Sequence, residues 1–126
     1  MLPFLYVALG GAMGAVARYA VSCSWLSWGG GPAWIATLLV NVVGAFLLGL
    51  FSGLTFAERA EAPTYWLLLT TGFCGGFTTF STFSLELVTL LQQGKYAPAL
   101  TYFTAATVLG LLGVMLGLYL ARGGAR

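Results

Sequence analysis

Four long hydrophobic segments follow one another along the chain, separated by short stretches of polar residues, glycine and proline. They cover residues 4–26, 33–56, 64–91 and 96–121. A helix needs about 20 apolar residues to cross the hydrocarbon core of a bilayer, so each segment is long enough to span a membrane. Tryptophan and tyrosine gather near the segment ends, as aromatic side chains do at membrane interfaces. The pattern predicts one all-α integral membrane domain, residues 1–126, with four transmembrane helices.

The composition indicates that lipid, rather than water, surrounds this chain. Charged residues make up only 6% of the 126 residues and hydrophobic residues 60%, whereas a soluble domain carries about 25% charged residues. The net charge of +2 is too small and too dispersed to suggest nucleic-acid binding. There is no histidine, no pair of intramembrane carboxylates and no nucleophile beside a base, so we do not expect an enzyme. Cys23 and Cys74 lack metal-ligand spacing and are expected to be apolar fillers.

The loop charges do not choose an orientation in the membrane. Four spans would place both termini and the middle loop on one side, with Arg59, Arg122 and Arg126. The opposite side would hold Lys95, and Arg18 if that side chain snorkels there. Orientation follows an asymmetry of Lys and Arg between the two sides, and here the asymmetry is slight. Insertion both ways up, giving an antiparallel homodimer, is therefore one hypothesis; a single orientation set by another feature is the alternative.

The third segment is unusually polar for a membrane span. It places Gly75-Gly76 at its middle, with several serine and threonine residues around the pair. The glycine pair predicts a weakened or broken helix, which is tolerated at membrane depth only where protein buries it or a cavity adjoins it. Freed carbonyls at such a break suit a cation, and the N-terminus of a half-helix favours an anion. A pair of glycines that only allows close packing is the alternative.

Beyond the glycine pair, helical spacing of about 100° per residue predicts two stripes. One consists of Phe77, Phe80 and Phe83, and the other of Thr79, Thr82 and Glu86. Aromatic rings have a positive edge, so ring edges and hydroxyls together can replace part of an anion's hydration shell. They do so without a full charge that would trap the ion, which conduction requires. Packing against lipid or core remains the simpler interpretation of the aromatic stripe.

A few isolated polar residues inside the spans are further candidates. Glu86 is the only carboxylate within a span, and it either has a function there or reaches the interface from the helix end. Asn41 lies in mid-span, where its amide either donates to an anion or bridges helices. Arg18 either attracts anions at a vestibule or snorkels, and Tyr102 offers one phenolic donor.

Three stretches of the sequence resemble the Fluc-type (CrcB) fluoride channels, and the resemblance extends over nearly the whole chain. They are GGAMGAVARY at residues 10–19, TLLVNVVG at 37–44 and TGFCGGFTTFSTFSLE at 71–86. The third stretch is the most specific. The resemblance implies a dual-topology antiparallel homodimer with two pores that lets fluoride leave the cell passively across the bacterial plasma (inner) membrane.

The resemblance also implies roles for individual residues. Phe80 and Phe83 would contact fluoride, and Asn41 would be the pore asparagine. The polar residues that line or flank the pathway would be Ser81, Thr82, Ser84 and Glu86. Arg18 would be the vestibule arginine, and Tyr102 occupies a position that is tyrosine in some members. The backbone carbonyls of Gly75 and Thr78 would hold a structural sodium ion, Na+, at the dimer centre. Serines that some members carry on the fourth helix are replaced here by Ala106 and Gly110, with Thr107 nearby.

Two other functions, a coupled exporter and a structural subunit, are the alternatives to a fluoride channel. A small dual-topology coupled exporter of the multidrug-resistance type normally has a carboxylate in its first helix, and this chain has none there. Only Glu86 could serve in its place. A structural subunit of a larger membrane complex would gain nothing from the polar, glycine-containing third segment.

Overall fold

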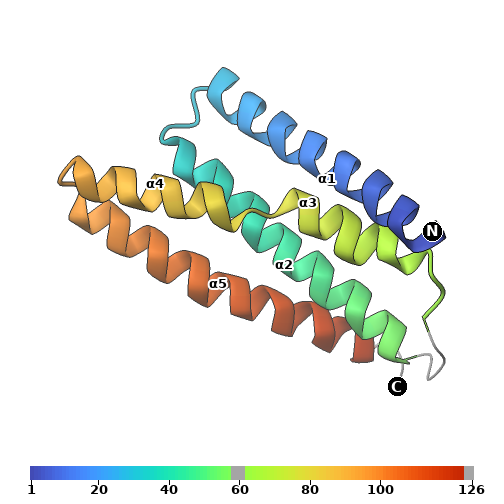
Figure 1. Ribbon diagram of the computed structural model, residues 1–126. Helices are drawn as coiled ribbons and strands as arrows, with labels where there is room; N and C mark the ends of the chain where they lie inside the picture. The colour runs from blue at the N-terminus through green and yellow to red at the C-terminus, as the bar shows by residue number, and fades with distance from the viewer. Residues whose placement is uncertain (58–61, 124–126) are drawn as a thin grey trace.

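The computed structural model describes residues 1–57 and 62–123, and every regular element in this part of the chain is helical. The elements follow in the order α1 (Leu2–Ser27), α2 (Ala33–Ala57), η1 (Leu68–Cys74), α3 (Gly75–Phe77), α4 (Phe80–Gln92) and α5 (Tyr96–Gly123) (Figure 1). The prediction of four spans is confirmed, since four helical stretches have the length and hydropathy to cross a membrane: 2–27, 33–55, 68–92 and 96–123. The third begins later than expected, at Leu68 instead of residue 64. Arg59 and Arg126, which entered the orientation argument, lie outside the described residues.

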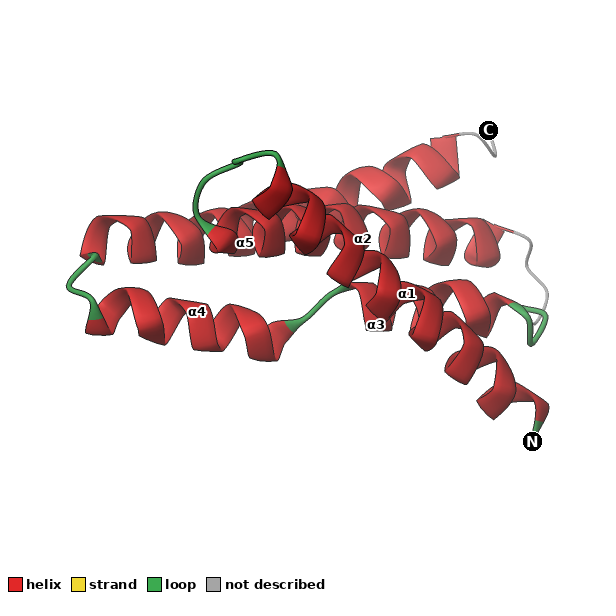
Figure 2. Ribbon diagram, turned by 90° about the horizontal axis from the view of Figure 1, so that it is seen from above, coloured by secondary structure: helices red, strands yellow, loops and turns green. Residues whose placement is uncertain are grey.

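Helix α2 is the centre of the bundle. It makes its most extensive contact with α5 and also touches α1, η1, α3 and α4. Helix α1 packs against η1 and α3, whereas α4 packs against α5 (Figures 1 and 2). The start of α1 and the end of α5 lie at the same end of the bundle, as an even number of spans requires.

Glycines allow the close helix contacts that the small-residue stripes suggested. A Cβ added to Gly14 of α1 would lie 2.8 Å from the backbone nitrogen of Phe77. On α5, a Cβ at Gly113 would lie 3.2 Å from the carbonyl oxygen of Val42, whereas one at Gly110 would meet nothing within 4 Å. Backbones of transmembrane helices approach closely only where such small residues face each other. Gly14 and Gly113 are therefore packing positions, and Gly110 is not.

The break in the third segment lies at Thr78 and Thr79, so the prediction of a break at Gly75-Gly76 is wrong. Gly75 is helical (φ −64°, ψ −38°), whereas Thr78 (φ −89°, ψ 156°) and Thr79 (φ −149°, ψ 122°) are extended. Figure 2 shows this extended link between α3 and α4. β-Branched residues favour extended backbone. Gly76 instead serves packing, because a Cβ there would lie 3.0 Å from the Cα of Gly11 on α1.

Candidate functional site

The side chain of Asn41, on α2, holds the helix break through two hydrogen bonds. The backbone N–H of Thr79 donates to Asn41 Oδ1 over 2.8 Å, and Asn41 Nδ2 donates to the carbonyl oxygen of Thr79 over 3.0 Å. The amide thereby satisfies a backbone N–H whose helical partner, the Gly75 carbonyl, is lost at the break. Of the two interpretations of Asn41, the structure shows the bridge between elements. One of its two N–H donors is used in this way.

A pocket of about 320 Å³ opens beside this clamp. Its lining residues come from α2, the break, α4 and α5: Asn41, Thr78, Thr79, Phe80, Phe83, Ala106 and Thr107. Four of them are residues to which the resemblance assigns contact with fluoride or sodium, and the fold brings them together. The lining contains no charged side chain among the described residues. An ion in this pocket would meet two phenylalanine side chains and the second N–H of Asn41, with no fixed charge to trap it. The hydroxyls of Thr78, Thr79 and Thr107 donate to other oxygens.

The aromatic stripe is not continuous, because the break separates Phe77 from Phe80. Phe77 is buried and stacks on Phe73, with ring centroids 5.5 Å apart. Phe80 is 79% exposed, whereas Phe83 is 9% exposed and meets the Tyr102 ring edge-on at 4.9 Å. The expectation of one stripe from Phe77 to Phe83 is therefore wrong, since it assumed a regular helix. Phe80 and Phe83, with centroids 5.9 Å apart, remain a pair at the pocket.

The hydroxyl residues of α4 organise the start of that helix rather than the pocket wall. Thr79 Oγ1 accepts a hydrogen bond from the backbone N–H of Thr82 over 3.2 Å, which caps α4. The same oxygen lies 3.2 Å from Thr82 Oγ1 and 3.3 Å from Ser81 Oγ. Ser84 Oγ donates to the carbonyl oxygen of Phe80 over 2.9 Å. None of Ser81, Thr82 and Ser84 lines the pocket, so they flank it.

Glu86 faces a different cavity from Phe80. Its Oε1 accepts a hydrogen bond from the hydroxyl of Tyr102 over 3.0 Å, and Tyr102 is fully buried. Glu86 lines a hollow of about 690 Å³ near the α4–α5 turn, together with Lys95 and Trp34. The predicted stripe of Thr79, Thr82 and Glu86 therefore does not act as a unit. Thr79 and Thr82 are in contact at the break, whereas Glu86 lines the separate hollow near the α4–α5 turn.

Arg18, on α1, reaches the backbone of the third segment next to the break and does not line the pocket. Its Nε donates to the carbonyl oxygen of Gly76 over 3.2 Å, across 58 positions in the sequence. The side chain is partly buried. The structure thus shows neither of the two roles considered for Arg18 from the sequence, and instead joins it to backbone at the break.

The carbonyls of Gly75 and Thr78 fit the type of cation site that the resemblance implies. Their regular helical partners would be the N–H groups of Thr79 and Thr82, which bond to Asn41 and to the Thr79 hydroxyl instead. Within the described residues no hydrogen bond reaches either carbonyl oxygen. Unwound carbonyls and half-helix C-termini are oxygen ligands for sodium in membrane proteins. These two residues would hold such an ion through backbone oxygens alone.

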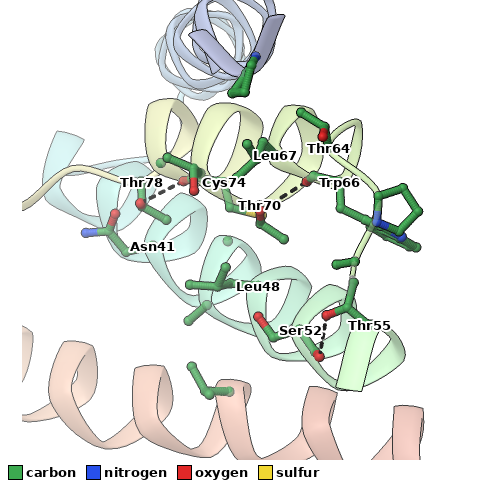
Figure 3. A pocket seen from close by; sticks show the side chains of 18 residues that line it. Asn41, Leu48, Ser52, Thr55, Thr64, Trp66, Leu67, Thr70, Cys74 and Thr78 are labelled. Atoms are coloured by element: carbon green, nitrogen blue, oxygen red, sulfur yellow. Dashed lines mark hydrogen bonds between the residues drawn. The ribbon is translucent and has the colours of Figure 1, made fainter. Parts of the chain in front are cut away.

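A larger groove of about 910 Å³ lies on the other side of Asn41, between α2 and the η1–α3 half of the third segment (Figure 3). Six hydroxyl residues line it, and three of them donate to carbonyls of their own segments. Thr78 Oγ1 bonds to the Cys74 carbonyl (2.8 Å), Thr70 to Trp66 (3.0 Å) and Thr55 to Ser52 (2.8 Å). The groove is therefore largely apolar, and the hydroxyls of Ser52, Thr64 and Thr71 are its remaining side-chain donors among the hydroxyl residues.

Three lining residues were not assigned to the pocket from the sequence: Thr79, Ala106 and Thr107. Thr107, which neighbours the missing serine positions in the sequence, lines the pocket from α5. Its hydroxyl donates to the Phe103 carbonyl over 2.9 Å, so it presents an oxygen lone pair. Thr79 was placed on a stripe but not at a break. The β-branched pair Thr78-Thr79 was the available signal for extended backbone.

Comparison with known proteins places the chain in a family. The family described as CrcB-like protein, Camphor Resistance (CrcB), matches residues 5–118. A protein of Gloeobacter violaceus is 46% identical over 116 residues, covering 91% of each chain. A protein of Saccharophagus degradans is 42% identical over 124 residues, covering 95% of this chain and 90% of that protein. One of Staphylococcus aureus is 39% identical over 122 residues, covering 97% and 98%. The first two are named fluoride-specific ion channel FluC and the third fluoride-specific ion channel FluC 1. The chain belongs to the CrcB-like family.

Proposed function

We propose that this chain conducts fluoride passively across the bacterial plasma membrane and so lowers fluoride in the cytoplasm. The relatives matched over almost the whole chain are named fluoride-specific ion channels. The observation that carries the proposal is the pocket at the break, which joins Asn41, Phe80 and Phe83 without a charged side chain. Fluoride is small and strongly hydrated, so a pathway must replace its lost water contacts. Ring edges and the free N–H of Asn41 would do this while leaving the ion free to depart.

The functional unit of the proposal is an antiparallel homodimer. Phe80 is 79% exposed although it lies at the middle of a membrane span, and the pocket beside it is open. The groove of Figure 3, between α2 and η1, is also open on one side. A second copy would enclose Phe80 and supply the missing wall of the pathway. Near-balanced loop charges allow the two copies to insert in opposite orientations.

A sodium ion held by the carbonyls of Gly75 and Thr78 is part of this proposal. Both oxygens lie on the carbonyl side of the break, where the end of a half-helix carries partial negative charge. A bound cation would neutralise that charge and fasten the two copies at their centre. The chain's own contribution is the break itself, which Asn41 keeps open by drawing the Thr79 N–H away from Gly75.

No observation favours the coupled exporter. Helix α1 (Leu2–Ser27) contains no acidic residue. The one carboxylate inside a span, Glu86, is bonded to the buried Tyr102 hydroxyl. A carboxylate that couples transport must exchange its proton or substrate with water on both sides of the membrane. The hydrogen bond between Glu86 and Tyr102 would have to break in each cycle.

The proposal is tested by ion efflux from liposomes that contain the purified protein. Fluoride and chloride electrodes are run in parallel, with and without an imposed pH gradient. We expect fluoride to leave down its own gradient, chloride to remain, and the pH gradient to drive no uphill fluoride movement. Equal release of both ions, or fluoride accumulation driven by the proton gradient, contradicts a passive fluoride-selective channel.

A further inference from the structure

One backbone carbonyl at the helix break accepts a hydrogen bond from a side chain of another helix. In a regular helix the Gly76 carbonyl would accept a hydrogen bond from the N–H of Phe80, four residues on. The extended residues Thr78 and Thr79 remove that bond. Arg18 Nε supplies a donor in its place, 3.2 Å from the same oxygen. A carbonyl left without a donor at membrane depth would be costly.

The spacing of residues on α1 explains how Arg18 reaches this carbonyl. Gly10, Gly14 and Arg18 follow each other at intervals of four and therefore share one helix face. At Gly10 the added Cβ would lie 2.9 Å from the Cα of Gly72, so the two backbones are in direct contact. Gly14 continues this contact one turn further, against Phe77. Arg18 then follows at the next turn, directly at the point where the third segment breaks.

Arg18 and Asn41 hold the two sides of the break from two different helices. Asn41, on α2, engages both backbone groups of Thr79. Arg18, on α1, engages the carbonyl of Gly76. Gly76 lies between Gly75 and Thr78, so fixing its peptide also fixes the direction of the neighbouring carbonyls. It likewise fixes where α4 restarts, and with it the position of Phe80 at the pocket.

We propose that Arg18 is a positioning residue for ion conduction, which acts as a hydrogen-bond donor to the break and not as a charge that attracts anions. This rests on the proposed function, since the readout is fluoride flux. The distinction matters because the two roles need different atoms. Positioning needs an N–H at the place of Arg18 Nε, whereas attraction needs only a positive charge nearby.

Three substitutions separate the donor from the charge. In Arg18→Gln the side-chain nitrogen stands at the same position along the chain as Nε, so the donor stays and the charge is lost. In Arg18→Met a methyl group takes that position, so both are lost at similar length. In Arg18→Lys the charge stays but a methylene replaces Nε and the ammonium lies one bond further out. The pair Gln and Met is matched for size and differs in the donor.

The variants are compared for yield of dimer and for fluoride flux from liposomes at saturating fluoride, in low and high salt. We expect Arg18→Gln to keep most of the parental flux. Arg18→Met should lose about tenfold to hundredfold, the order of one charge-assisted hydrogen bond. The loss should not change with salt, because a buried contact is screened little. If Arg18→Met yields little dimer while Arg18→Gln yields as much as the parent, the difference in yield also supports the need for a donor at this position.

The opposite ranking would refute the proposal. If Arg18→Gln and Arg18→Met are impaired equally, or neither is impaired, in both assembly and flux, no donor is needed at this position. If only Arg18→Lys conducts like the parent and the defects of the other two diminish in high salt, Arg18 acts by its charge. A parent protein that releases no fluoride instead contradicts the proposed function, and the ranking of dimer yields then still tests the hydrogen bond.

Discussion

The clamp made by Asn41 predicts that an apolar residue of the same size at this position will weaken both the fold and the channel. Asn41→Leu removes two hydrogen bonds, of 2.8 and 3.0 Å, that join α2 to Thr79. Hydrogen bonds between transmembrane segments contribute about 0.6 kcal/mol each on average, and those in soluble proteins about 1 kcal/mol. Two bonds therefore give about 1–2 kcal/mol, and the unpaired Thr79 N–H adds roughly a further 1 kcal/mol or more. The expected cost is about 2–3 kcal/mol.

A matched control exists on the same helix. Thr55→Val also removes a polar group from α2, but the Thr55 hydroxyl bonds only within its own helix, to the Phe51 and Ser52 carbonyls. We expect its effect on stability to stay within about 0.5 kcal/mol. Thermal unfolding in detergent compares the two variants at one fixed protein concentration, so that any effect of self-association on the melting temperature is the same for both. Fluoride flux from liposomes is measured on the same samples.

The loss of stability in Asn41→Leu also predicts a loss of fluoride flux. If the backbone at the break shifts, part of the lost energy is added to the barrier for conduction. About 1.4 kcal/mol added to that barrier lowers the rate tenfold. We expect Asn41→Leu to conduct at least about tenfold less than Thr55→Val. If Asn41→Leu melts and conducts like Thr55→Val, the clamp does not hold the break and the reasoning from these bonds is wrong.

Three further predictions use pairs or single changes that the structure distinguishes. Phe80→Ile should abolish most fluoride flux while each chain still folds, because Phe80 is 79% exposed within its own chain; Phe83→Ile should also lower the melting temperature, since it loses an edge-on ring contact worth about 0.5–1.5 kcal/mol. Equal melting of the two variants would contradict this. Gly76→Ala should lower the melting temperature, because its Cβ would press on α1 of the same chain, whereas Gly75→Ala should leave the packing within the chain intact, because nothing in the chain lies within 4 Å of its Cβ; a larger loss of stability for Gly75→Ala than for Gly76→Ala would contradict this. Tyr102→Phe should destabilise by about 1.5–3 kcal/mol, as it leaves a carboxylate without its donor, and an unchanged melting temperature would show that water replaces it.

The sequence alone determined the number and approximate extent of the membrane helices. This is possible because the requirement of about 20 apolar residues per span is local and does not depend on which helix packs against which. The sequence also showed, through its resemblance to a family, which side chains belong near one another: Asn41, Phe80 and Phe83 do meet at one pocket. Insertion in both orientations, the homodimer and the sodium ion stay predictions.

The position of the break was decided by tertiary structure. Glycine pairs permit a break, but Gly76 is needed for contact with Gly11 and stays helical, while Thr78 and Thr79 become extended. The choice depends on partners for the freed backbone groups, and those partners are on other helices. For the same reason the stripe from Phe77 to Phe83 failed, since helical spacing cannot be counted across a break whose place is unknown.

The role of Arg18 shows most clearly what the sequence leaves open. A single arginine inside an apolar segment is compatible with snorkelling, with attraction of anions and with a bond to backbone. The sequence sets its interval of four from Gly14. Only the fold shows that this face of α1 lies against α3, and that a carbonyl 58 positions away has lost its helical donor there. Long-range pairing of this kind has no local signal, because either partner alone looks like an ordinary residue of its own helix.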